Sequence, residues 1–107
     1  MQWYATSLDG QAFSPQEKLS FLADNSDYVA ANGVTTAGGF RMYAFAVPRK
    51  NILSFFSADG MNWVQEDGVR LQHDPNSTVE GSYIKDPAVL QLADGSYLMV
   101  YVSRIPE

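Results

Sequence analysis

Apolar and polar positions alternate along several short stretches of the chain, with turn-forming residues between them. Residues 96–103, SYLMVYVS, and 52–57, ILSFFS, are almost continuously apolar. A period of two, interrupted by Gly, Asp, Asn and Pro, predicts β-strands joined by turns. Strands are predicted at 2–7, 19–22, 28–35, 40–47, 52–57, 63–64, 69–71, 84–92 and 96–103. No stretch has a helical period, so the predicted fold class is all-β.

The stretch 40–47, FRMYAFAV, is apolar on both of its faces. Alternation places Phe40, Met42 and Ala44 on one side of this strand, and Arg41, Tyr43 and Phe45 on the other. We therefore expect a central strand that is covered from both sides.

Turn signals divide the strands. Asp94-Gly95 is a strong hairpin signal, and the polar residues 23–27 predict another turn. Asn32-Gly33 is expected to break the strand 28–35. Pro87 lacks an N–H group, so the strand 84–92 should start or bulge at Asp86-Pro87.

The chain contains an internal repeat. Two Ser-x-Asp-Gly-x-x-aromatic stretches lie fifty positions apart: Ser7, Asp9, Gly10 and Phe13, then Ser57, Asp59, Gly60 and Trp63. Further on, Gly38, Phe40 and Met42 match Gly95, Tyr97 and Met99 at fifty-seven positions. The polar loop 72–82 accounts for the larger offset. A repeat of this length is one supersecondary unit that cannot bury its apolar faces alone.

Each repeat has about four strands, the size of a β-propeller blade. We predict one domain over residues 1–107 with two blade-like repeats, about 2–50 and 51–104. The strands would run as the third and fourth of one blade, all four of the next, and the first and second of a last one. Two blades cannot close a ring. The expectation is therefore a homo-oligomer in which 84–103 of one subunit pairs with 2–22 of the next, as a trimer in preference to a dimer. A piece of a longer propeller is the alternative.

Charge and composition narrow the partners. The net charge is −5 and the seven Lys and Arg are scattered, which disfavours nucleic acid and anionic membranes. No apolar run reaches the ~20 residues of a membrane span, and no signal peptide is visible, so a soluble, by default cytoplasmic, protein is expected. The chain has no cysteine. Neither a metal cluster nor a phosphate-binding glycine loop is seen, so the sequence predicts no metal and no cofactor.

The repeated turn and the stretch DPAVLQLADGSYLMVY resemble propeller glycosidases. The turn is similar to the Asp box of sialidase-like propellers, with one residue fewer between Asp and Gly. The tighter turn, the Asp-Pro-x-Val strand and the Asp-Gly-x-Tyr hairpin more closely resemble the five-bladed clan of arabinanases, invertases and mannoside phosphorylases. This resemblance covers nearly the whole chain as blade structure, and fold likeness does not specify activity.

The resemblance implies a site around Asp86. In that clan the Asp of an Asp-Pro pair lies at the sugar site, so Asp86 is the candidate catalytic residue, with Tyr83, Lys85 and Asp86 as candidate substrate-binding residues. Alternatively, Asp86 only binds backbone N–H groups at a strand start. Glycoside hydrolysis needs two carboxylates. Glu80-Gly81 only loosely resembles the clan's Glu-Gly-Pro acid motif, because the Pro is absent and the spacing to Asp86 is too short, so one chain supplies one site carboxylate.

The remaining candidates have structural interpretations. Structural turns are assigned to Ser7, Asp9, Gly10, Ser57, Asp59, Gly60, Asp94 and Gly95. Phe13 and Trp63 are expected in the core or between blades, Glu80 in a solvated loop, and His73 exposed. Six aromatic residues are candidates for a sugar-stacking platform, although core packing suits each of them: Trp3, Tyr4, Tyr28, Tyr43, Tyr83 and Tyr101.

Three functions therefore follow. The first is a carbohydrate-associated propeller module that binds glycan and assembles into a closed ring. The second is a glycoside hydrolase, or a piece of one, that uses Asp86. The third is a purely structural assembly module. The sequence leaves open whether the chain is an enzyme.

Overall fold

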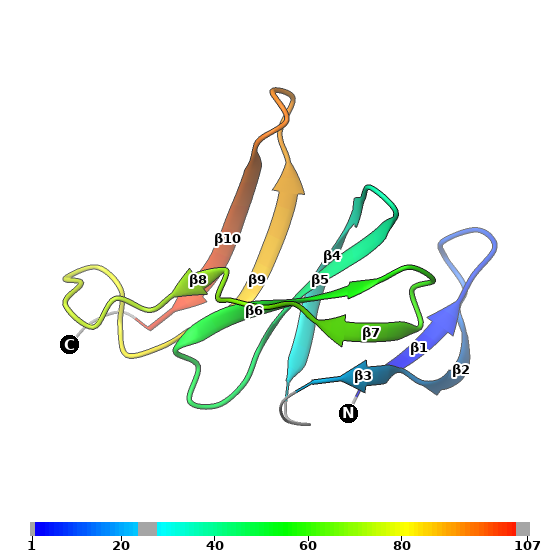
Figure 1. Cartoon of the computed structure of the whole chain (residues 1–107), viewed down its shortest axis with the longest axis horizontal. Helices are drawn as coiled ribbons and strands as arrows, with labels where there is room; N and C mark the ends of the chain where they lie inside the picture. Colours follow the sequence, from blue (N-terminus) through cyan, green and yellow to red (C-terminus); the bar gives the residue numbers. More distant parts are fainter. Residues whose placement is uncertain (1, 24–27, 105–107) are drawn as a thin grey trace.

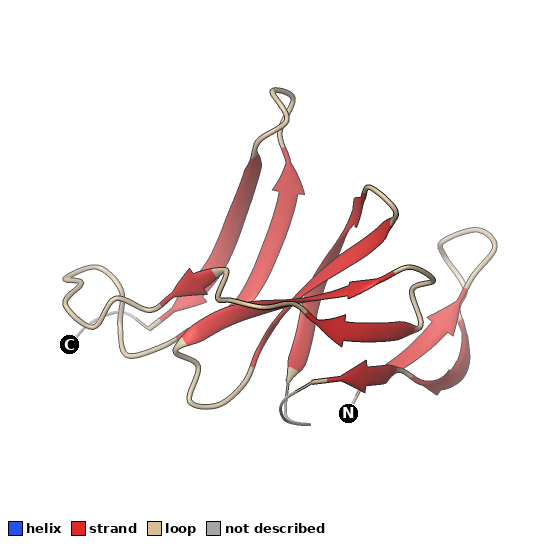
Figure 2. Ribbon diagram, viewed as in Figure 1, coloured by secondary structure: helices blue, strands red, loops and turns tan. Residues whose placement is uncertain are grey.

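The computed structural model describes residues 2–23 and 28–104, and every regular element in them is a β-strand (Figures 1 and 2). This confirms the predicted all-β class. The strands are β1 Trp3–Thr6, β2 Ser14–Lys18, β3 Ser20–Leu22, β4 Val29–Thr36, β5 Gly39–Phe45, β6 Asn51–Ser57, β7 Asn62–Gln65, β8 Leu71–Gln72, β9 Ile84–Gln91 and β10 Tyr97–Ser103.

The largest sheet is an antiparallel meander of four consecutive strands, β4-β5-β6-β7, with the three-residue β3 added parallel to β7. The short strand β8 pairs with β6 beyond the end of β7. The meander follows from the sequence because alternating strands separated by short turns pair with their neighbours along the chain.

A two-stranded hairpin lies on each side of the meander. β1 pairs with β2, and β9 pairs with β10, each antiparallel and each as a separate sheet. In Figure 1 the two hairpins stand on opposite sides of β4 and β5. None of the three sheets closes on itself.

Two apolar clusters cover the two faces of β5, as its sequence predicts. Tyr43 packs with Ile52 and with Ile84 and Val89 of β9, so this cluster joins the meander to the β9–β10 hairpin. On the other face, the next residue along β5 belongs to a second cluster. That cluster consists of Ala44, Phe55 and Trp63, with Leu19, Phe21, Ala23, Tyr28 and Met42 packed against it.

The β4–β5 and β9–β10 hairpins each have a β-bulge, at equivalent positions of their first strands. In β9 the pairing shifts between Val100 and Val102, opposite Asp86 and Pro87, and Asp86 has φ 51°. The predicted bulge at Pro87 is therefore present. In β4 the shift lies next to Ala30, and the strand continues through Asn32-Gly33, where the sequence suggested a break.

Two further differences concern the N-terminal part. β2, SPQEK, was not predicted as a strand, because it is polar throughout and begins with Ser-Pro. It forms as the partner of β1, and all five of its residues are exposed. The predicted polar turn at 23–27 falls mainly on residues 24–27, which lie outside the described residues.

Candidate functional site

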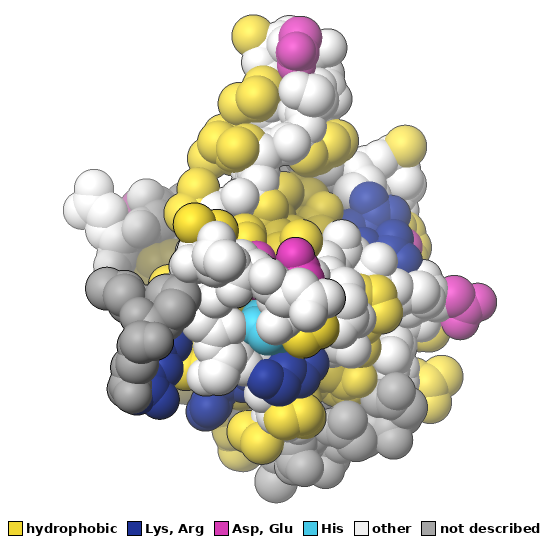
Figure 3. Space-filling model, turned by 90° about the vertical axis from the view of Figure 1, so that its left-hand side faces the viewer, with side chains coloured by type: hydrophobic (Ala, Val, Ile, Leu, Met, Phe, Trp, Pro, Cys, Tyr) yellow, Lys and Arg dark blue, Asp and Glu magenta, His cyan; other side chains and the backbone are white. Residues whose placement is uncertain are grey.

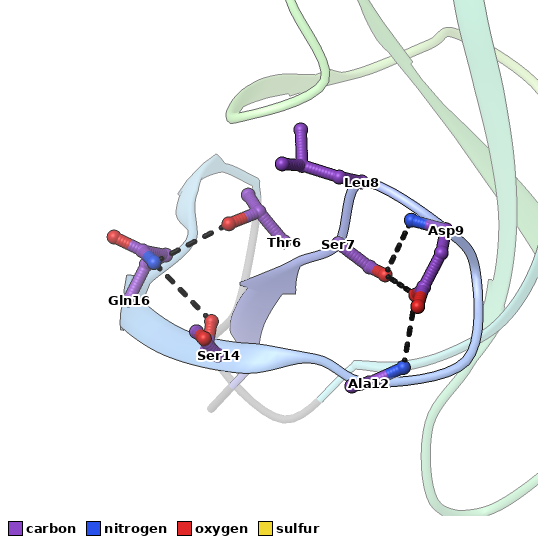
Figure 4. Close-up of a pocket in the computed structure, with 7 residues that line it drawn as sticks. All are labelled: Thr6, Ser7, Leu8, Asp9, Ala12, Ser14 and Gln16. Carbon is purple, nitrogen blue, oxygen red and sulfur yellow. Dashed lines mark hydrogen bonds between the residues drawn. The ribbon is translucent and has the colours of Figure 1, made fainter.

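The two Ser-x-Asp-Gly turns have the same hydrogen bonds. In the first turn, the Ser7 hydroxyl accepts from the N–H groups of Asp9 and Gly10, at 3.2 and 2.9 Å. The Asp9 Oδ1 atom accepts from the Ser7 hydroxyl and from the N–H groups of residues 11 and 12, at 2.9, 2.9 and 3.1 Å. Figure 4 shows those of the contacts that join Ser7, Asp9 and Ala12. Each polar side chain is thus committed to holding the turn.

The second turn repeats this arrangement. Ser57 accepts from the N–H groups of Asp59 and Gly60 at 3.3 and 2.8 Å, and Asp59 Oδ1 accepts from those of Met61 and Asn62 at 2.8 and 2.9 Å. Gly60 has φ 85° and Gly10 has φ 75°, a conformation that favours glycine. The repeat seen in the sequence therefore extends to individual hydrogen bonds.

Hydrogen bonding lowers the pKa of both turn carboxyls. The N–H groups of Gln11 and Ala12 lower the pKa of Asp9 to about 2. The pKa of Asp59 is lowered as well, first by the N–H of Asn62 and then by that of Met61. A carboxyl held ionised in this way cannot donate a proton near neutral pH.

The aromatic residues that follow the turns differ in their surroundings. Trp63 is 5% exposed and its Nε1 donates to the Gly60 carbonyl at 3.0 Å. Phe13 is 59% exposed, so it does not lie in the core of the chain, and its packing between blades stays a prediction. An open depression of about 420 Å³ adjoins the first turn, between Leu8 and Gln16 (Figure 4).

The residues predicted to bind substrate lie together at the start of β9, and Arg49 joins them from the β5–β6 connection. The Tyr83 ring has Arg49 Cζ 5.9 Å and Lys85 Nζ 5.7 Å from its centroid, both within cation–π range. Lys85 Nζ also lies 3.8 Å from Asp86 Oδ2. We call Arg49, Tyr83, Lys85 and Asp86 the β9-start cluster. Sequence analysis missed Arg49 because only the fold places it beside Tyr83.

Two residues of the β9-start cluster have unusual backbones. Arg49 has φ 64° and Asp86 has φ 51°, and positive φ is uncommon for residues other than glycine. The Ile84 N–H donates to the Arg49 carbonyl at 2.8 Å, which ties the two segments together. Arg49 Nε is buried and has no hydrogen-bond partner within the described chain. Strain and an unsatisfied donor coincide here with exposed charged groups, a combination typical of functional sites.

Basic side chains gather on the face around this cluster. Lys50 is a third basic residue here, in addition to Arg49 and Lys85. Its ammonium group donates to the carbonyl of Ser82, next to Tyr83. Lys and Arg side chains lie below His73, the cyan side chain in Figure 3. The face is therefore locally positive in a chain whose net charge is −5.

Asp86 supplies a carboxylate that is half-exposed and ion-paired only with Lys85 among the described residues. The geometry thus offers a basic and aromatic binding surface with one acid, whereas hydrolysis of a glycosidic bond needs two acids across the bond.

Glu80 is not part of the β9-start cluster, and both of its carboxylate oxygens accept hydrogen bonds. Its Oε2 accepts from the Tyr101 hydroxyl at 2.6 Å, and its Oε1 accepts from the Asp74 N–H at 3.1 Å. The Tyr101 hydrogen bond is the main reason that the pKa of Glu80 is lowered. The same bond raises the pKa of Tyr101. A glycosidase acid needs a raised pKa, so these contacts argue against Glu80 in that role.

His73 is 7% exposed, and the interpretation of this residue as exposed is wrong. Its Nε2 contacts the Gly81 carbonyl and lies 3.9 Å from Glu80 Oε1. Glu80 is itself only 14% exposed in its side chain, so it is not the solvated loop residue expected. Together they fasten the loop 73–81 against β10.

The partly buried ion pair between Arg41 and Glu66 has a structural role. Arg41 binds Glu66 through two parallel hydrogen bonds of 2.7 and 3.0 Å, and the Ser54 hydroxyl donates to the same carboxylate at 2.8 Å. These contacts lower the pKa of Glu66, chiefly through Arg41. They tie β5, β6 and the end of β7 together.

The aromatic candidates for sugar stacking fall into separate places. Tyr43 is in the core, Tyr101 binds Glu80, and Tyr28 packs edge-on against Phe55. Trp3 is 70% exposed on the β1–β2 hairpin, far along the chain from β9. Of the six residues, Tyr83 is the one that lies in the β9-start cluster.

No protein family, curated protein or solved structure matches the chain. In the part of the chain that the structure describes, no three His, Asp or Glu residues come together as a metal site. The same residues contain no helix that is long and apolar enough to span a membrane.

Proposed function

We propose that the chain is a β-propeller module that binds carbohydrate at the β9-start cluster and completes its sheets by self-association. One observation carries the proposal: a four-stranded meander is flanked by a two-stranded hairpin on each side. Two, four and two antiparallel strands amount to two four-stranded blades that are divided between three places. Two chains would then supply four blades, and three chains six.

Contacts between the sheets support the blade arrangement. The side chain of Asn32 on β4 accepts from the Val89 N–H of β9 at 2.8 Å, so the first strands of the meander and of the next hairpin lie side by side. In a propeller the first strand of every blade lines the central axis. β4 and β9 would be two such strands, and Asp86 lies near the beginning of β9.

The chemistry of the β9-start cluster supports binding in preference to cleavage. Tyr83 offers an aromatic ring, which suits the apolar face of a sugar, and Lys85 and Asp86 offer hydrogen bonds to hydroxyl groups. Binding sites of this type combine a stacking surface with a few oriented polar groups. One exposed carboxylate is enough for recognition but not for the two-acid mechanism of hydrolysis.

The test is binding to a broad array of glycans, followed by calorimetry with the best ligand. We expect Tyr83→Ala to weaken binding at least tenfold through lost stacking, and Asp86→Asn to weaken it by a smaller factor. Asp67→Asn, at an exposed position after β7, is the matched control and should bind as wild type. If no glycan binds, a purely structural module is left and the binding proposal is wrong.

A glycoside hydrolase is the second candidate, favoured by the half-exposed carboxylate of Asp86 and its positive φ. It predicts release of sugar that Asp86→Asn abolishes without loss of fold. Sugar release that is unchanged in Asp86→Asn would exclude this role for Asp86.

A further inference from the structure

We infer that β1 of a second copy of this chain pairs with β10, antiparallel, in a register that the chain itself specifies. The inference rests on the proposed blade arrangement and names the partner that completes it. The argument starts from the strand pairs that occur twice within one chain.

Two kinds of strand pair are duplicated with identical register. Shifting β6 and β7 back by fifty positions converts Phe55↔Gln65 and Phe56↔Val64 into Ala5↔Pro15 and Thr6↔Ser14, which are the two observed pairs of β1 and β2 nearest their turn. The two hairpins therefore share their register next to the turn, whereas β1 and β2 have a further pair, Trp3↔Lys18, beyond a register shift.

The same holds for the other hairpin. Shifting β4 by fifty-six positions and β5 by fifty-seven reproduces every pair between Lys85↔Val102 and Gln91↔Tyr97, with the bulge at the same place. β10 is therefore the counterpart of β5, and β1 is the counterpart of β6.

One kind of pair occurs only once. β5 pairs with β6 through Phe40↔Ser57, Arg41↔Phe56, Met42↔Phe55, Tyr43↔Ser54 and Ala44↔Leu53. Moving β5 forward by fifty-seven positions and β6 back by fifty converts these pairs into pairs between β10 and β1. The predicted contacts are Tyr97↔Ser7, Leu98↔Thr6, Met99↔Ala5, Val100↔Tyr4 and Tyr101↔Trp3.

β1 of the same chain does not occupy this place. It pairs with β2 on the far side of the meander from β10 (Figure 1). The sheet order places β10 and β1 each at an edge, with one neighbour only. A second copy supplies the missing neighbour for both edges.

Neither edge is protected against pairing. β10, YLMVYVS, and β1, WYAT, contain no charged residue and no proline, the usual devices that keep edge strands apart. Their apolar side chains are exposed: Trp3 is 70% exposed and Val100 is 57% exposed. Pairing would cover them, and the absence of charge on both strands leaves no repulsion to overcome.

The apolar face of the β9–β10 hairpin has a matching surface. Leu90, Leu98 and Val100 are exposed on one side of this hairpin. The meander carries an open, mostly apolar depression of about 320 Å³ over Phe40, Met42 and Trp63. The β5 face that carries Met42 is opposite to the one against which the chain's own β9 packs. A copy joined through β1 would bring that depression next to the exposed hairpin face.

Engineered cysteines test the register, because the chain has no cysteine of its own. Chains with Thr6→Cys are mixed with chains with Leu98→Cys and oxidised mildly. Directly opposed residues have Cα atoms about 4.5–5.5 Å apart, within the range of a disulfide. Val100→Cys with Tyr4→Cys is a second pair, for use if Thr6→Cys fails to fold.

Ala5→Cys with Leu98→Cys is the matched control, since a shift of one residue turns the side chain to the other face of the sheet. We expect the Thr6 pair to form a covalent heterodimer about tenfold faster than this control. Equal rates, or no covalent product from either opposed pair, would overturn the inference. A monomer by light scattering that still binds glycan would overturn it and leave the binding proposal standing. A cross-linked assembly that binds no glycan would support the inferred strand pairing and overturn the binding proposal.

Discussion

A serine hydroxyl and an aspartate carboxylate determine each Ser-x-Asp-Gly turn, and the two copies differ in their burial. Ser57, the last residue of β6, is 1% exposed, whereas the Ser7 turn lies at the surface. The same hydrogen bonds thus occur in two environments. Because water replaces a lost acceptor only where it can reach the donor, the two turns should respond differently to the same substitution.

Ser57→Ala removes the acceptor of two backbone N–H groups in a partly buried turn. We expect the free energy of unfolding to fall by about 1–2 kcal/mol. Ser7→Ala is the matched control and should cost clearly less, because its N–H donors are solvent-accessible. Urea denaturation of both variants measures the difference. Equal losses would contradict this account of the turns.

Acid should destabilise the protein through the turn carboxyls. The pKa values of Asp9, about 2, and of Asp59 are both below the unfolded value of about 3.9. The stability that they contribute is complete above the unfolded pKa and is lost as the pH falls through the folded one. We expect the Tm to fall between about pH 4 and pH 2, and to fall less in Asp59→Asn than in an Asp67→Asn control. A parallel fall in both variants would refute this cause.

The loop residues His73 and Glu80 show what a single sequence does not reveal. Their stretch, 72–82, is polar, and polar loops are normally solvated. The partner of Glu80 is Tyr101, twenty-one positions away, on a strand whose own pattern predicts only packing. A long-range hydrogen bond between two ordinary residue types leaves no local signal. The Asp86 bulge, in contrast, was predictable because proline acts locally.

At the level of elements, strands with internal periodicity were predicted and strands made by pairing were not. β5, β6 and β10 each contain their own run of apolar residues. β2 has none and exists because β1 supplies hydrogen bonds along its length. The parallel addition of β3 to β7 joins segments about forty positions apart, so it depends on tertiary structure.

Ile84, which is fully buried in the first cluster, is one of the residues that attach the β9–β10 hairpin to the meander. Ile84→Ala should cost about 2–5 kcal/mol, because the site is closed on all sides. Hydrogen exchange should then speed up in β9 and β10 more than in β5. Leu92→Ala, at an exposed position, is the control and should change stability by less than about 0.5 kcal/mol. Uniform acceleration over all strands would contradict a separately attached hairpin.

For the whole molecule, the inferred pairing of β10 with β1 of another copy predicts that stability depends on protein concentration. A partner that binds only the folded chain raises the apparent Tm by mass action. We therefore expect the Tm of the wild-type chain to rise with protein concentration. Leu98→Lys, which places a charge on the unprotected β10 strand, should abolish this dependence, whereas Val79→Lys in the exposed loop should keep it. A wild-type Tm that does not change with concentration would argue for a monomer.

Pairing of unlike edges also fixes the symmetry. A β10 edge that meets a β1 edge is a head-to-tail contact, which closes into a ring at a suitable rotation and otherwise continues as a filament. Light scattering behind a sizing column separates these cases. A trimer corresponds to six blades and a dimer to four.

The strand β3, three residues long, lies along β7 and covers that side of the central sheet. On the other side, β9 contacts β4 through Asn32. The two edges that we infer to pair, β10 and β1, have different sequences, so each molecule would offer one edge of each kind. A copy in which one of these edges is mutated can still pair through its other edge, but no further copy can then be added at the mutated edge. A small fraction of such copies would therefore block the assembly of a larger fraction of wild-type chains.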